Sequence, residues 1–226
     1  MVGLMTSIAE PNIVRNHPFP TRRWVMLGIV LFLSLLVIGS ITTYNRLVTL
    51  DQGVQASWAE VENTYQRRAD LVPNLVNTVR GAAAFESETL LAVTAARTRV
   101  TQASGSASGR APGATPTASA EAFANYQQAQ DGLSTSLSRL MVVVERYPDL
   151  RATQNFRDLQ SQLEGTENRI AVARMRFNEA AQAFNAKRSS FPTVLIVNIM
   201  GNRFRNKPYF AAAPGAQSVP NVDFNR

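Results

Sequence analysis

Apolar residues recur along much of the chain at alternating steps of three and four positions. The first series begins at Leu47, passes through Trp58 and Tyr65, and continues to Ala82. Such steps place side chains on one face of an α-helix, so the series predicts a helix with a single apolar stripe. No Gly-Pro or Asn-Gly break separates this series from the apolar run at residues 24–44 that precedes it. We therefore expect one continuous helix that extends from this run to about Gln102.

The second series follows a stretch rich in Gly, Pro, Ala and Ser at residues 103–119. That stretch has too little apolar surface to order itself, and we expect a flexible connector there. After it, side chains recur at helical spacing and are expected on the buried face of a helix: Phe123, Tyr126, Gln130, Leu133, Leu137, Leu140, Val144 and Tyr147. Ser119 is the expected N-cap of this helix, and Pro148 is expected to stop it.

A third series runs from Phe156 to Phe184, and Thr153 can cap it. Each series is apolar on one stripe only, so none of the helices would be stable alone in water. Helices with matching stripes and short or flexible links pack side by side in opposite directions. The sequence therefore predicts an all-α fold, with an antiparallel bundle of three long helices and a short C-terminal element at residues 45–210. Residues 211–226 are expected to form a disordered tail.

An uncharged run, WVMLGIVLFLSLLVIGSITTY, precedes the bundle and extends from Trp24 to Tyr44. A helix needs about 20 apolar residues to cross a bilayer, and aromatic rings at both ends suit the two membrane interfaces. A cleaved signal peptide is the alternative. Its apolar region usually has about 7–15 residues, whereas this run is longer and no clear A-x-A site follows it. We therefore expect an uncleaved, single-pass anchor.

The positive residues near the two ends of this run predict its orientation. Arg15, Arg22 and Arg23 precede the run, whereas only Arg46 lies close behind it. Cytoplasmic flanks carry the excess of Lys and Arg, so residues 1–23 are expected in the cytoplasm. The bundle is then expected on the periplasmic or extracytoplasmic side of the inner (cytoplasmic) membrane.

The composition excludes several kinds of chemistry. The chain has no cysteine, so disulfides, thiolate nucleophiles and cysteine-bound metals are ruled out. Its one histidine, His17, lies outside the bundle, which rules out a Ser-His-Asp triad or a histidine-rich zinc site there. The net charge of +7 includes no basic block interleaved with aromatic residues, so we expect no nucleic-acid partner. We also expect no metal, no cofactor and no small-molecule substrate.

One stretch of the first helix, RRADLVPNLVNTVRG at residues 67–81, is unusually polar. The candidate site residues in and after it are Arg67, Arg68, Asp70, Pro73, Asn74 and Glu86. The helical spacing directs Arg68 and Glu86 into the apolar stripe. Pro73 has no N–H, so the carbonyl of Ala69 loses its helical partner and the helix is expected to bend. A nearby Asn or Arg side chain could satisfy that carbonyl.

Two interpretations of this stretch compete. As a catalytic site, Asp70 would act as a base and the arginines would bind an oxyanion or phosphate, but no nucleophile, metal cluster or glycine-rich loop accompanies them. As a structural network, paired buried polar groups would fix the register of the helices. We favour the network and expect an arginine at 67–68 to pair with Glu164 or Glu167. The candidate residues on the third helix are Glu164, Glu167, Arg169 and Arg174.

A short apolar run, VLIVNIM, follows Pro192 and is too short to cross a membrane. Five positive residues and no acid lie between Lys187 and Lys207. We favour packing of this segment on the bundle over contact with an anionic surface. With about 1.5 Å per helical residue, we expect the segment far from the anchor, at a distal contact. The candidate contact residues are Lys187, Arg188, Val194, Ile196, Arg203, Arg205 and Lys207.

Several motifs occur in order between residue 45 and about residue 210. RRADLVPNLV and LEGTENRIAVAR are the most specific, beside WAEVENTYQ, RYPDL and FPTVLIVNIMGNRF. On these motifs the chain resembles the LemA family of bacterial membrane proteins, with a mild departure at Phe177, where the family typically has tyrosine. The resemblance implies one N-terminal transmembrane helix and a long helical bundle. It implies no catalytic residue, so the polar motif residues carry over only as signature positions.

These observations predict a membrane-anchored helical scaffold or assembly protein of the bacterial envelope, without catalytic activity. Its expected partners are the lipid bilayer, further copies of the chain and, as a further candidate, another membrane protein. An adaptor that regulates a membrane enzyme, such as an envelope protease, is the first alternative. The second, less favoured alternative is an enzyme that uses Asp70 with Arg67 and Arg68.

Overall fold

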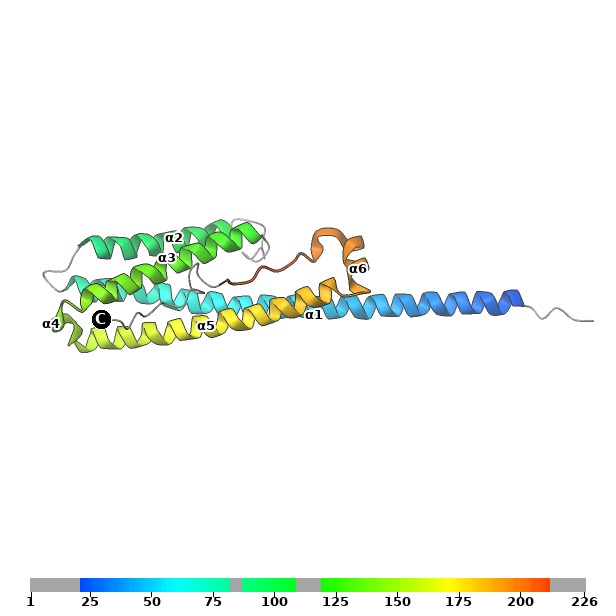
Figure 1. Cartoon of the computed structure of the whole chain (residues 1–226), viewed down its shortest axis with the longest axis horizontal. Helices are drawn as coiled ribbons and strands as arrows, with labels where there is room; N and C mark the ends of the chain where they lie inside the picture. Colours follow the sequence, from blue (N-terminus) through cyan, green and yellow to red (C-terminus); the bar gives the residue numbers. More distant parts are fainter. Residues whose placement is uncertain (1–20, 82–86, 109–118, 212–226) are drawn as a thin grey trace, which may run out of the picture. The chain divides into compact units, whose positions relative to one another are not determined.

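The computed structural model describes residues 21–81, 87–108 and 119–211. All of its regular elements are helices, which confirms the predicted all-α fold (Figure 1). The chain consists of two compact units, residues 1–42 and residues 43–226. The predicted N-terminal segment up to residue 20, Glu86, most of the predicted connector and the tail after residue 211 lie outside the described residues.

The first unit contains the N-terminal part of helix α1 (Thr21–Arg80). The large apolar side chains from Trp24 to Ile41 are exposed all around this part of the helix. A helix that is apolar on every side suits the interior of a membrane. Among the described residues it is the one helix long and apolar enough to cross a bilayer. The predicted apolar N-terminal helix is thus confirmed, and it suggests a membrane anchor.

The second unit contains the rest of α1 and the remaining helices. These are α2 (Ser87–Ser108), α3 (Ala120–Val144), α4 (Pro148–Arg151), α5 (Gln154–Ser189), α6 (Thr193–Met200) and the 3-10 helix η2 (Gly201–Arg203). Within this unit α2 packs along α3, and α5 runs along α1 in the opposite direction (Figure 1). Successive long helices alternate in direction, which confirms the predicted antiparallel bundle.

The single helix predicted to extend to Gln102 is wrong, because α1 ends at Arg80 and α2 begins at Ser87. Gly81 follows α1, and its amide donates to the carbonyl of Asn77 at 3.3 Å. Glycine is a poor helix former and often follows the end of a helix, so it favours a stop here. The apolar pattern did not reveal the stop, since helical spacing reports the buried face and not the direction of the chain.

Helix α2 folds back along the bundle. Its buried residues share an apolar cluster with α1 and α3: Leu90, Val93, Ala96 and Val100. The helix also continues to Ser108, so positions 103–108 are helical and do not belong to the predicted connector. The remaining connector residues, 109–118, lie outside the described residues.

This additional reversal places α6 at the opposite end of the bundle from the one predicted. The ring of Phe204, just after η2, packs edge-on against Tyr44 with their centroids 5.8 Å apart. Val197 and Phe204 are also buried in one cluster with Leu47. The predicted distal position is therefore wrong for the segment that carries Lys187, Arg188, Val194, Ile196, Arg203, Arg205 and Lys207. One helical reversal more than predicted returns α5 and α6 to the end at which α1 enters the bundle.

Aromatic rings fill the core of the second unit around Trp58. The centroid of its ring lies 5.6 Å from those of Tyr126 and Phe177 and 6.1 Å from that of Phe210. These rings come from α3, α5 and the segment after η2, so Trp58 joins all three to α1. The predicted buried positions within α3 are confirmed: Phe123, Tyr126, Gln130, Leu133, Leu137, Leu140 and Val144. Tyr147, the last residue of the predicted series, lies after the end of α3 and is partly buried.

Local signals at the helix ends are largely as predicted. Ser119 is the N-cap of α3, and its hydroxyl accepts a hydrogen bond from the amide of Ala122 at 3.5 Å. Thr153 is the N-cap of α5, but its hydroxyl donates to the carbonyl of Leu150 and does not cap an amide. Pro148 begins the short helix α4 after α3 has ended, as its fixed backbone angle favours.

Replacement of Trp58 by alanine is expected to destabilise the bundle strongly, because the ring is almost fully buried among four other rings. We expect a loss of about 3–5 kcal/mol in the free energy of unfolding, measured by urea denaturation of the detergent-solubilised chain followed by circular dichroism. Trp24→Ala is the matched control, since that ring is 73% exposed and should change the value by less than about 0.5 kcal/mol. Equal effects of the two changes would contradict this assignment of the core.

Candidate functional site

Arg68 is fully buried on the inner face of α1, and its guanidinium binds both α3 and α5. Its Nη1 donates to Oε1 of Glu167 at 2.7 Å and also to the hydroxyl of Ser134. Its Nη2 donates to Oε1 of Gln130 and, at 3.1 Å, to the backbone carbonyl of the same residue. One side chain therefore joins three helices through four hydrogen bonds.

The geometry of this site requires an arginine. A guanidinium presents five N–H donors in a planar fork, whereas a lysine ammonium has three donors around one atom. Nη1 of Arg68 donates toward α3 and α5, and Nη2 donates toward α3. Within the described part of the chain, its Nε and the Nε2 of Gln130 have no hydrogen-bond partner. The buried charge of Arg68 is thus compensated by the carboxylate of Glu167.

Of the pairings predicted from the sequence, the structure contains Arg68 with Glu167. The neighbouring Arg67 is exposed and does not point into the bundle. Glu164 is also exposed, and it accepts a hydrogen bond from Nε2 of Gln160 at 2.9 Å. The helical spacing of Arg68 relative to the apolar stripe was the signal that distinguished it from Arg67.

The structure separates Asp70 from Arg68, two residues of the alternative catalytic site. Asp70 is exposed on α1 and accepts a hydrogen bond from Gln66 at 2.8 Å. Positions two apart on a helix face nearly opposite sides, so Asp70 points away from the buried Arg68. Among the described residues there is also no group of three His, Asp or Glu side chains suited to a metal ion.

Pro73 creates the acceptor that holds α2 against α1. Because the proline has no N–H, the carbonyl of Ala69 lacks its usual helical donor. In the structure Nε of Arg97, on α2, donates to this carbonyl at 3.1 Å. An arginine side chain thus satisfies the freed carbonyl, as the sequence suggested, but it comes from the helix whose return was not predicted.

Arg174 forms a second junction between helices. Its Nε donates to the hydroxyl of Tyr65 at 2.7 Å, and its Nη2 pairs with Asp131 at 2.8 Å. The guanidinium also lies over the rings of Tyr65 and Phe210, at 5.5 Å and 5.1 Å from their centroids. Arg174 on α5 therefore connects α1, α3 and the C-terminal segment.

The other predicted network residues lie apart from these junctions. Asn74 and Arg169 are exposed on α1 and α5, and Glu86 lies outside the described residues. Sequence reasoning did not assign Ser134, Asp131 or Arg97 to the network. It did place Gln130 in the apolar series of its helix, and an uncharged polar residue at such a position requires a buried partner. That requirement was the available signal for the Arg68 site.

Burial raises the pKa of Tyr65 from its ordinary value of 10.0 to about 12, although the nearby charges of Arg174 and Arg68 oppose the shift. Burial likewise raises the pKa of Tyr126. Removing a phenol from water disfavours its charged form. Both hydroxyls therefore remain protonated at neutral pH and serve as hydrogen-bonding groups of the core.

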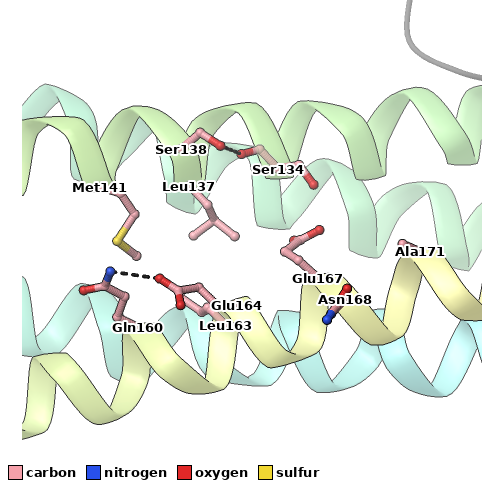
Figure 2. A pocket seen from close by; sticks show the side chains of 10 residues that line it. All are labelled: Ser134, Leu137, Ser138, Met141, Gln160, Leu163, Glu164, Glu167, Asn168 and Ala171. Carbon is pink, nitrogen blue, oxygen red and sulfur yellow. Dashed lines mark hydrogen bonds between the residues drawn. The ribbon is translucent and has the colours of Figure 1, made fainter. Parts of the chain in front are cut away.

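A groove of about 530 Å³ lies between α3 and α5, beside the Arg68 site. Figure 2 shows its residues: Ser134, Leu137, Ser138, Met141, Gln160, Leu163, Glu164, Glu167, Asn168 and Ala171. The side chains of Leu137 and Met141 extend from α3 toward α5, and Glu167 lies across from Ser134 (Figure 2). A mixed apolar and polar groove between two helices can receive the side chains of another helix.

The model of the LemA family matches residues 57–224, which is most of the chain. This chain belongs to the LemA family. It is 28% identical over 224 residues to the magnetosome proteins MamQ 1 and MamQ 2 of Paramagnetospirillum magneticum, covering 93% of this chain and 82% of each relative. It is 27% identical over 202 residues to magnetosome protein MamQ of Magnetospirillum gryphiswaldense, covering 85% and 72% of the two chains. The resemblance inferred from the motifs is thus confirmed.

In this LemA-family bundle, Arg68→Met is expected to lower the free energy of unfolding by about 3–5 kcal/mol, because it leaves the buried acceptors of Gln130 without a donor. A double-mutant cycle with Glu167→Gln should give a coupling energy of about 1–2 kcal/mol, measured by urea denaturation in detergent. Arg67→Met is the matched control, and its effect should stay below about 0.5 kcal/mol. A coupling energy near zero would contradict the assigned pair.

The stability of the LemA-family bundle is expected to fall at high pH through Tyr65. The folded chain keeps this proton to about pH 12, whereas the unfolded chain loses it near 10.0, so the contribution is complete below pH 10.0 and is lost between the two values. The loss should reach about 2–3 kcal/mol, seen in urea denaturation at stepwise pH. Tyr65→Phe should flatten this dependence, with the remainder due in part to Tyr126. An unchanged slope would contradict the burial effect.

Proposed function

We propose that this protein is a membrane-anchored helical scaffold of the bacterial envelope, in which copies associate through their bundles, and that it catalyses no reaction. Its proposed partners are the lipid bilayer and further copies of the chain. The proposed function involves no cofactor and no nucleic acid. The main observation in its support is that residues of the polar motifs form contacts between the helices of the bundle.

The two polar motifs supply structural contacts. Arg68 and Glu167 hold α1, α3 and α5 in one register, and Arg97 holds α2 to α1. These groups are buried or already paired with one another, so they offer little free capacity for a substrate. Asp70, the base of the alternative enzyme, is exposed and away from Arg68. The pattern supports a rigid binding or assembly module over a reaction site.

The proposed location is the inner membrane, with the N-terminus in the cytoplasm and the bundle on the extracytoplasmic side. The apolar part of α1 from Trp24 to Tyr44 supports the single span. The arginines that precede it support the orientation. Relatives that are named magnetosome proteins support a role in a cellular structure over a role in a metabolic reaction.

The groove between α3 and α5 is the proposed contact between copies. Its apolar lining residues Leu137, Met141 and Leu163 can receive side chains from a helix of a neighbouring copy. Met175 lies one helical turn beyond Ala171 and is 53% exposed, so the apolar stripe continues past the groove. Exposed apolar side chains next to this groove favour the packing of a helix from a neighbouring copy against it.

An adaptor that docks on a membrane enzyme, such as an envelope protease, is the second candidate function. The same groove favours it, because a helix of another protein would fit there as well as a helix of a second copy. The two functions predict different oligomeric states for the isolated protein. An adaptor is expected to be a monomer until its partner is present, whereas the scaffold associates on its own.

The detergent-extracted full chain is expected to form a large, uniform assembly in light scattering. Its size should be compared with that of a shortened chain that lacks residues 1–44, to separate association through the bundle from association through the apolar helix. A clean monomer of both chains would contradict the scaffold and favour the adaptor, whose partner could then be sought by crosslinking in cells.

Ala171→Glu tests the contact surface in the same measurement. A carboxylate placed in the groove should reduce the assembly to smaller species, because it would be buried against apolar side chains at the contact. Ala183→Glu is the matched control, since this exposed alanine is on α5 but does not line the groove. Circular dichroism should show both variants folded. An assembly that survives Ala171→Glu would exclude the groove as the contact.

A further inference from the structure

Helix α6 carries large apolar side chains that the bundle does not cover. Thr193 and Val197 are buried against the bundle, whereas Leu195 and Ile199, on the opposite face of the helix, are 53% and 87% exposed. Phe191, which precedes α6, is 79% exposed. An exposed cluster of this kind on a short helix marks a surface that is covered by something else.

The segment that contains this apolar face carries positive residues and no acidic residue. The sequence has no acidic residue from position 180 to position 222. Arg203 and Arg205 are exposed just after α6, and Lys187 is partly exposed just before it. Lys207 is paired with Asp51, and Arg188 donates to the carbonyl of Phe204, so those two cations serve the bundle. Lys187, Arg203 and Arg205 thus remain as cations in the segments before and after α6.

The position of this face within the second unit indicates what covers it. Phe204 and Arg203 both contact the ring of Tyr44, with the guanidinium 5.6 Å from the ring centroid. Tyr44 is the last residue of the uncharged apolar run. The segment that follows α6 therefore lies against the last residue of the proposed membrane span. The chain thus holds the α6 region close to the end of that span.

We propose that α6 docks on the surface of the membrane that anchors the chain, with Phe191, Leu195 and Ile199 among the lipids and the neighbouring cations on anionic headgroups. An element with an apolar face and a basic rim binds the interface of an anionic bilayer in this way. The inference rests on the proposed membrane anchor but not on the proposed association of copies. A second copy is a weaker occupant, because a like copy would bring its own cations to a rim without acids.

Site-directed labelling tests this docking directly. The chain has no cysteine, so Asn198→Cys puts a single polarity-sensitive fluorophore on the exposed side of α6 without loss of an apolar group. The full chain would be reconstituted in vesicles of phosphatidylcholine, with or without phosphatidylglycerol, whose acyl chains carry bromine as a quencher. Matched labels at Ser34→Cys and Ala152→Cys report on the anchor and on the opposite end of the bundle.

The label at position 198 should be quenched by the brominated lipids, more strongly in anionic vesicles and less strongly at high salt. The label at position 34 should be quenched in both lipids, and the label at position 152 in neither. Arg203→Glu and Arg205→Glu should each lower the docked-to-free ratio by about fivefold or more, as expected for loss of a cation near an anionic surface. Leu195→Asp should abolish the quenching, whereas Leu91→Asp, at an exposed leucine of α2, should not.

Two results would overturn the inference. Quenching at position 198 no greater than at position 152, with position 34 quenched, would exclude docking of α6 and leave the anchor and the assembly untouched. Energy transfer between labelled copies at position 198, without quenching by lipid, would assign the face to a second copy instead. An unquenched label at position 34 would contradict the proposed anchor itself, and the docking of α6 with it.

Discussion

The buried charge of Arg68 is the constraint on which the bundle depends. Apolar stripes on long helices can slide past one another by a turn with little loss of contact, but a buried guanidinium needs a counter-charge and hydrogen-bond acceptors at fixed positions. The partners of Arg68 are Gln130 and Ser134 on α3 and Glu167 on α5. They come together in one register of three helices. The polar contacts therefore select the arrangement, and two apolar clusters, one of them around Trp58, supply the apolar burial that stabilises it.

A second polar contact follows the same logic for α2. Pro73 leaves the carbonyl of Ala69 without a helical donor, and Arg97 supplies one from α2. A proline within a long helix would ordinarily be a defect. Here the freed acceptor provides a directional contact for a helix whose buried face includes small apolar side chains such as Val93 and Ala96. The two arginine contacts together position all four long helices.

Much of the bundle could be predicted from the sequence, because helical spacing determines which side chains are buried. It correctly placed Gln130 on the buried face of α3 and Arg68 on that of α1. Spacing does not determine the direction of a helix, so the stop at Gly81 went unrecognised and α6 was expected at the wrong end. The partners Ser134 and Arg97 were missed for a related reason. Which residues meet across helices depends on direction and register, and neither is encoded in the pattern of one helix.

Glu167 connects the internal register of the bundle with its outer surface. One of its carboxylate oxygens holds Arg68, yet the side chain remains 44% exposed and lines the groove between α3 and α5. The pairing of Arg68 therefore contributes to the position of the groove walls, because the guanidinium joins α3 and α5 beside the groove. A surface defined in this way is the same in every copy, which a repeating assembly requires. The polar motifs thus contribute to the proposed scaffold function through the register that they fix and through Glu164, Glu167 and Asn168, which line the groove.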